Sequence, residues 1–132
     1  IGAFNVAQES SKIMIKQKKG NIVNMTSIAA DIVGAGELVH YAMSKGAVDS
    51  LTYGMAKELG VYGIRVNAVA PGLIATDIHA KAGDASRVER LMPSVLLGRV
   101  GLAKEVADTV IWLLSEKSSY VCGTIVRISG GR

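Results

Sequence analysis

Apolar and polar residues follow two different periods along this chain, and each period predicts one kind of secondary structure. From Val39 to Leu59 the apolar residues Val48, Leu51, Met55 and Leu59 recur at intervals of three or four residues. That interval brings side chains to one face of a helix, so the segment predicts a long helix with one buried stripe. Shorter apolar blocks bounded by glycine or proline are typical of buried strands.

The same reasoning places the other elements along the chain. The predicted helices are Phe4 to about Lys18, stopping at Gly20, a short helix near Ser86–Met92, and Glu105–Leu114 with Val106, Val110, Leu113 and Leu114 facing inward. The predicted strands are Asn21–Thr26, Ile64–Ala70 and Thr124–Ile128. Pro71 and Gly72 should end the middle strand, because proline donates no ladder hydrogen bond. Residues 73 to about 101 are predicted to be mobile apart from the short helix.

Helices that alternate with strands predict an α/β fold with parallel strands and right-handed crossovers. Three such strands make half of a Rossmann-like doubly wound sheet, and 132 residues suffice for a single domain. Ligands of open α/β sheets bind beyond the carboxyl ends of the strands. Ser27 and the Pro71–Gly72 pair both follow predicted strands, so we expect the functional site at that edge.

Composition narrows the class of protein. With 49% hydrophobic and 20% charged residues the chain is globular, and it has no apolar run long enough for a membrane helix. Cys122 is the single cysteine, expected to be buried; one thiol fits a reducing cytoplasm. The net charge is +4, and three of the positive residues, Lys16, Lys18 and Lys19, lie close together just before Gly20. A helix C-terminus explains them better than a nucleic-acid surface, because no aromatic residues are interleaved.

Candidate chemistry centres on Ser27, Tyr41 and Lys45. Tyr41 and Lys45 are four residues apart in the predicted long helix, so they share one helical face. An ammonium held near a phenol favours the phenolate, which lets a tyrosine exchange a proton with an alcohol. A serine at the end of the preceding strand could bind the same substrate oxygen. The two histidines and one cysteine are far apart in sequence and predict no metal site.

The surrounding sequence strengthens this interpretation. The stretch Asn21–Ser27 precedes the Tyr–Lys pair and Ile64–Gly72 follows it, and together they resemble the short-chain dehydrogenase/reductase family over essentially the whole chain. Ser27 and Tyr41 are fourteen residues apart, one more than the commonest family spacing, which a loop insertion around residues 34–37 would absorb. The resemblance implies an oxidoreductase that transfers a hydride between NAD or NADP and a carbonyl or alcohol substrate.

The resemblance also implies residue roles. Tyr41 would be the general acid/base, Lys45 would bind the cofactor ribose as well as assist Tyr41, and Ser27 would hydrogen-bond the substrate oxygen. Cofactor contacts are further implied for Tyr41 itself and for a nicotinamide clamp formed by Pro71, Gly72, Ile74 and Thr76. His40 is expected to face solvent or a loop, and His79 lies in the segment that would cover the substrate.

A family member is roughly twice as long as this chain and carries a Gly-rich pyrophosphate-binding turn near its start. No GxGxxG motif opens a helix here, so we expect residues 1–132 to be the C-terminal part of a single NAD(P)-binding domain. The alternative is a truncated, inactive fragment that retains only the dimerisation helices, Phe4–Lys18 and Val39–Leu59. A homodimer or homotetramer is implied in either case. The choice between NAD and NADP and the identity of the substrate stay open.

Overall fold

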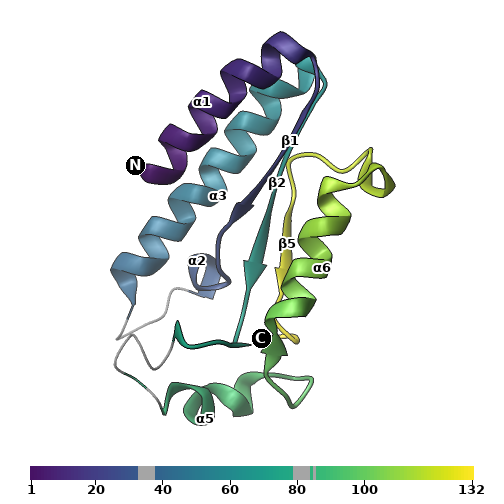
Figure 1. Cartoon of the computed structure of the whole chain (residues 1–132). Helices are drawn as coiled ribbons and strands as arrows, with labels where there is room; N and C mark the ends of the chain where they lie inside the picture. The colour runs from purple at the N-terminus through teal and green to yellow at the C-terminus, as the bar shows by residue number, and fades with distance from the viewer. Residues whose placement is uncertain (33–37, 79–83, 85) are drawn as a thin grey trace.

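A computed structural model describes residues 1–32, 38–78, 84 and 86–132. The loop expected to absorb the longer Ser27–Tyr41 spacing (residues 34–37) and the candidate substrate contact His79 lie outside the described residues. The described part is an α/β arrangement in which a parallel sheet lies between helices (Figure 1). The predicted fold class is therefore confirmed.

Three parallel strands form the main sheet, in the order β1-β2-β5. They are β1 (Gly20–Met25), β2 (Ile64–Pro71) and β5 (Ile125–Ile128), and the long helices are α1 (Gly2–Gln17), α3 (Val39–Leu59) and α6 (Ala103–Leu114). In Figure 1, α1 and α3 run side by side on one face of the sheet and α6 covers the other. The bounds of α3 match the prediction, and the other predicted helices and strands are present with ends shifted by up to two residues.

The central strand β2 carries the core because helices cover both of its faces. Val66 packs with Ala56 and Leu59 on the α3 side, whereas Val69 packs with Val106 and Leu113 on the α6 side. Val66, Val69 and Leu113 have 0% of their surface exposed. Burying a side chain of this size stabilises a fold by roughly 1.5–3 kcal/mol, so the sheet is held mainly at β2.

Three predicted burial assignments need correction. On α3 only Leu59 of the predicted stripe is buried, and the other buried positions are Ala42, Thr52 and Ala56, because small side chains let the helix approach the sheet. Leu114 is 48% exposed. Its neighbour Leu113 faces the core, and adjacent helical residues point in different directions. Cys122 is exposed rather than buried, since Val121 before it takes the inward position.

Two predicted boundaries are also corrected. Lys18, with φ of 51°, makes the left-handed C-cap of α1, and its N–H donates to the Ile15 carbonyl at 3.2 Å. Gly20 is therefore not the cap but the first residue of β1. Pro71 remains in β2, paired with Ile128. It lacks an N–H, but its carbonyl accepts the Ile28 N–H at 3.2 Å, so proline can end the ladder as an acceptor.

Several short elements were not predicted. They are α2 (Ala29–Ile32), β3 (Ile74–Ala75), β4 (Gly101–Leu102) and the 3-10 turns Gly60–Tyr62, Met92–Ser94 and Glu116–Ser118. The expected short helix is present as α5 (Arg87–Leu91). Strands β3 and β4 pair in parallel, which joins the two ends of the segment 73–101 next to the sheet.

Candidate active site

The carboxyl ends of the three strands are joined by main-chain hydrogen bonds that continue beyond the regular ladder. The Thr26 N–H donates to the Val69 carbonyl at 2.9 Å, and the Ile28 N–H donates to the Pro71 carbonyl at 3.2 Å. Ser27 therefore lies between two residues that are both bonded to β2. Its position is fixed by the sheet rather than by a free loop.

Lys45 connects helix α3 to the end of β1. Its ammonium Nζ donates to the Met25 carbonyl at 3.0 Å and lies 5.6 Å from the centroid of the Tyr41 ring. The hydroxyl of Thr26 donates to the Lys45 main-chain carbonyl at 3.2 Å, which fixes this turn of α3 against the strand. The structure thus brings Lys45 to Tyr41 and to the strand end that carries Ser27.

The two hydroxyl groups at this edge have different surroundings. Ser27 Oγ accepts the N–H of Ala29 at 3.2 Å, so its own O–H proton is left for another acceptor. In the described part of the chain the Tyr41 hydroxyl makes no hydrogen bond, and the side chain is half-buried. Both hydroxyls can therefore donate to a substrate oxygen without first breaking an internal bond.

The Pro71–Gly72 turn lies directly beside the last strand. The Gly72 N–H donates to the Ile128 carbonyl at 2.9 Å, and a Cβ at Gly72 would lie 2.8 Å from Ser129 Cα. Only glycine fits this approach. Ile74 turns its side chain into the α6 core cluster, and the exposed Thr76 hydroxyl accepts the Ile78 N–H at 3.4 Å. A clamp role for these four residues, and the three catalytic roles, stay predictions.

Met25 and Thr26, which the family resemblance implies flank the cofactor, have a further role in positioning Lys45 that the sequence did not predict. The Met25 carbonyl receives Lys45, and the buried Thr26 hydroxyl anchors the same helical turn. The Met25 carbonyl cannot be predicted from the sequence, because every residue has a main-chain carbonyl. The role of Thr26 can be inferred once the end of β1 is known to lie against α3. His40 is exposed, as predicted. Within the described ranges, no group of three His, Cys, Asp or Glu side chains could hold a metal ion.

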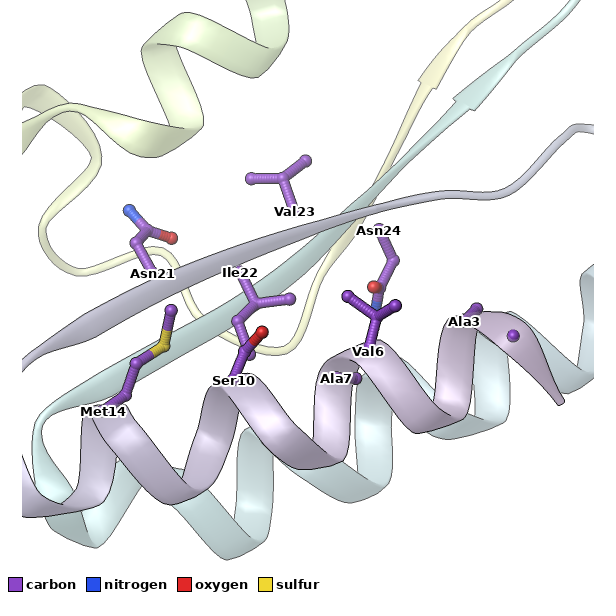
Figure 2. Close-up of a pocket in the computed structure, with 10 residues that line it drawn as sticks. Ala3, Val6, Ala7, Ser10, Met14, Asn21, Ile22, Val23 and Asn24 are labelled. Atoms are coloured by element: carbon purple, nitrogen blue, oxygen red, sulfur yellow. The ribbon is translucent and has the colours of Figure 1, made fainter.

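A separate groove lies along β1, away from these residues. Figure 2 shows Met14, Ser10 and Val6 of α1 facing Ile22 of the strand. None of the candidate catalytic side chains lines this groove.

In the described ranges, no helix is long and apolar enough to cross a membrane.

Comparisons with known proteins find similar sequences over nearly the whole chain. The family model described as enoyl-(acyl carrier protein) reductase matches residues 1–132. The uncharacterised oxidoreductase YgfF of Escherichia coli is 43% identical over 99% of this chain and 54% of its own length. The 3-oxoacyl-[acyl-carrier-protein] reductase of Thermotoga maritima is 44% identical over 98% of this chain and 52% of its own length.

Solved structures of dehydrogenases are also similar to this chain over 98% of its length. A short-chain dehydrogenase/reductase from Mycobacterium marinum superposes with a TM-score of 0.92 at 36% identity, covering 98% of this chain and 51% of that one. A gluconate 5-dehydrogenase from Burkholderia cenocepacia, solved with NADP and tartrate, gives 0.90 at 35% identity over 98% and 51% of the two chains. The chain thus spans about half the length of the relatives that it matches. It belongs to the short-chain dehydrogenase/reductase family.

Proposed function

We propose that this chain forms the catalytic half of an oxidoreductase that transfers a hydride between NAD or NADP and a small carbonyl or alcohol substrate. The observation that carries the proposal is the position of Lys45. Its ammonium lies between the Tyr41 ring and the end of β1, 3.0 Å from the Met25 carbonyl. This gives a proton-transfer group, a cation and the Ser27 hydroxyl at the sheet edge where α/β proteins bind ligands.

The described residues fit a nicotinamide cofactor at this edge. An ammonium has three donors, and Met25 takes one of those of Lys45, which leaves two for ribose hydroxyls. Gly72 presents main chain without a Cβ beside the strand end, where a planar carboxamide could approach. The cofactor, when bound, supplies or accepts the hydride.

The proton is the protein's part of the reaction. In the reducing direction, the Tyr41 hydroxyl gives its proton to the carbonyl oxygen as the carbonyl carbon receives the hydride, so the products are an alcohol and a tyrosinate. The Ser27 hydroxyl donates a hydrogen bond to the same oxygen and stabilises its developing negative charge. Lys45 stabilises the tyrosinate until a proton returns from solvent.

The test is a cofactor assay on the full-length protein that carries this chain. NADH and NADPH are each incubated with aliphatic aldehydes, ketones and 3-oxo thioesters, and the loss of reduced-nicotinamide absorbance is followed. Substrate-dependent oxidation of one cofactor is expected. No oxidation with any carbonyl, together with no reverse reaction from the alcohols, would overturn the proposal.

A second candidate is self-association without catalysis, and one feature favours it. A groove lies between α1 and α3, and Phe4, which lines it, is 50% exposed. The lining residues are Ile1, Ala3, Phe4, Ser44, Ala47, Val48, Ser50 and Leu51. In this case residues 1–132 alone would form a homodimer or homotetramer in sedimentation experiments, and calorimetry would detect no tight binding of NAD or NADP. Micromolar cofactor binding by residues 1–132 alone would exclude this candidate.

A further inference from the structure

Two side chains of β1 are bonded to helix α3 at points two helical turns apart. The Asn24 amide Nδ2 donates to Thr52 Oγ1 at 2.9 Å, and the Thr26 hydroxyl donates to the Lys45 carbonyl at 3.2 Å. Figure 2 shows Asn24 pointing from β1 toward the side of the strand on which the helices lie. The two bonds therefore join the same strand and the same helix at two separate levels.

The bond between Asn24 and Thr52 has a single direction. Thr52 has 0% of its surface exposed, and its own hydroxyl proton is donated to the Val48 carbonyl at 2.8 Å. Because that proton is used, Thr52 Oγ1 must accept, and the Asn24 amide must present its NH2 group. Asn24 also lines the groove beside β1, where water can reach it. Thr52 is thus the member of the pair that is closed to water.

The second of these bonds determines how α3 is oriented along the strand. Lys45 and Thr52 are seven residues apart, about 10.5 Å along a helix, and Tyr41 lies about 6 Å beyond Lys45 in the opposite direction. A helix bonded only at Lys45 can pivot there, because the apolar packing of Ala56 and Leu59 against β2 has no fixed direction. By the ratio of these two lengths, a shift of about 1 Å at Thr52 would move the Tyr41 main chain by about 0.6 Å.

We propose that Asn24 and Thr52 are positioning residues for the proton transfer, because their bond holds Tyr41 at the distance from Ser27 that the reaction needs. Ser27 is fixed at the end of β1, whereas Tyr41 is carried by α3. The distance between their hydroxyl groups therefore depends on how the helix lies on the strand. Asn24 and Thr52 act through Tyr41 and make no contact with the substrate. The inference goes beyond the proposed function and rests on it for the reaction.

Thr52→Val and Thr52→Ser separate the hydrogen bond from the packing. Valine has a shape similar to that of threonine but no hydroxyl, so it removes the acceptor of the Asn24 amide. The Val48 carbonyl keeps its helical bond from the main-chain N–H of residue 52. Serine keeps the hydroxyl and loses only a methyl group. Thr109→Val is the matched control, because the Thr109 hydroxyl donates to the Glu105 carbonyl at 3.2 Å and this bond stays inside α6.

Crystal structures of the full-length protein test the inference without any need for turnover. In Thr52→Val the distance from Tyr41 Oη to Ser27 Oγ should differ from that in the wild type by about 0.5 Å or more, which exceeds the tolerance of a catalytic arrangement. In Thr52→Ser and Thr109→Val this distance should be the same as in the wild type. An unchanged distance in Thr52→Val would overturn the inference, whatever reaction the protein catalyses.

Steady-state kinetics add the link to catalysis. With a carbonyl substrate, kcat per folded active site should fall about tenfold in Thr52→Val while KM stays the same, because a misplacement of ~1 Å can cost ~10²-fold in rate. Thr52→Ser should keep most of the wild-type kcat, and Thr109→Val should keep all of it. Val106→Ala removes part of the core beneath α6, so it should lower the melting temperature without lowering kcat per folded site.

Two kinetic outcomes would overturn the inference. One is an equal loss of kcat per folded site in Thr52→Val and Val106→Ala, which would mean that only stability is affected. The other is a loss of kcat in Thr52→Val that Thr52→Ser shares in full, because serine keeps the acceptor. A wild type that reduces no carbonyl would instead count against the proposed function alone, and the distance between Tyr41 and Ser27 in the crystal structures would still decide the positioning role.

Discussion

The two flanks of the main sheet differ in how closely the rest of this chain packs against them. We call the tightly packed β5 side the closed flank and the β1 side the open flank. On the β5 flank the chain packs closely, because Gly72, Gly130 and Gly131 have no side chain that would clash with Ser129, Val95 and Leu96. Hydrogen bonds from Leu97 to Gly130 and from Gly72 to Ile128 fix this flank. On the β1 flank no residue of the strand is fully buried, and the groove of Figure 2 runs beside it. The strand end on this flank is held by main-chain bonds to β2 and by side-chain bonds from Lys45 and Thr26.

The difference suggests a division of work at one edge. The residues proposed to move a proton lie on the open flank, where a cofactor and substrate can approach. The closed flank contributes a fixed turn, in which the Leu97 N–H donates to the Gly130 carbonyl at 3.0 Å. Changes on the open flank should therefore affect catalysis, whereas changes on the closed flank should affect stability.

The largest expected effect comes from Tyr41→Phe on the open flank. The phenyl ring keeps its packing, but the proton donor is lost, so kcat with a carbonyl substrate should fall by at least ~10²-fold. Tyr53→Phe makes the same chemical change on the same helix at a position that is 47% exposed, and should leave kcat unchanged. Similar kcat values for both variants in steady-state assays would contradict the role of Tyr41.

Gly72→Ala should lower the stability of the protein by disturbing the turn beside β5. The new methyl group would meet Ser129 Cα at 2.8 Å and Ile28 Cδ1 at 3.3 Å, so the turn must shift. Overpacking of this kind typically costs about 1–3 kcal/mol, which chemical denaturation would report as a lower midpoint. Gly54→Ala is the control, because nothing lies within 4 Å of that site on α3 and alanine favours a helix by up to ~1 kcal/mol. A loss of stability in Gly54→Ala equal to that in Gly72→Ala would remove the contrast between the two sites.

These two predictions show what sequence patterns reveal and what they do not. Periodicity was enough to locate α3, and the spacing of Tyr41 and Lys45 was enough to nominate them, because both depend on residues close in sequence. The contacts of Gly72 with Ser129 and of Gly130 with Val95 join residues far apart in the chain. The deeper burial of Ala56 and Thr52 than of Leu51 depends on how closely α3 approaches the sheet, which no local pattern contains.

Lys45→Met sharpens the comparison, because it should change cofactor binding with little change in stability. Met25 is 50% exposed, so water can replace the ammonium at its carbonyl. Losing a charged hydrogen bond to the ribose should weaken cofactor binding about tenfold or more, which fluorescence titration of the reduced cofactor can measure. Lys57→Met removes an exposed lysine from the last turn of the same helix and should bind cofactor normally. Unchanged affinity in Lys45→Met would refute the ribose contact.

The smallest effect is expected at the start of α6. A hydrogen bond from Arg99, and then one from the Leu102 N–H, lower the pKa of the Glu105 carboxyl from 4.5 to about 2. A lowered folded-state pKa means that the ionised carboxylate stabilises the fold, so this contribution is complete above about pH 4.5 and is lost as the pH falls toward 2. The melting temperature of Glu105→Gln should therefore lie slightly below that of the wild type at neutral pH, and the difference should shrink across that window. A difference that stays constant from pH 6 to pH 2 would contradict the ionic contribution.

The most direct test of the account is the position of a substrate oxygen in a crystal structure of the full-length protein with oxidised cofactor and an unreactive alcohol analogue. The account predicts that Tyr41 Oη and Ser27 Oγ both lie about 2.6–3.2 Å from that oxygen. Lys45 Nζ should contact a ribose hydroxyl in the same structure. A substrate oxygen bound by other groups, with the Tyr41 hydroxyl facing solvent, would contradict the central claim that Ser27, Tyr41 and Lys45 form one catalytic site.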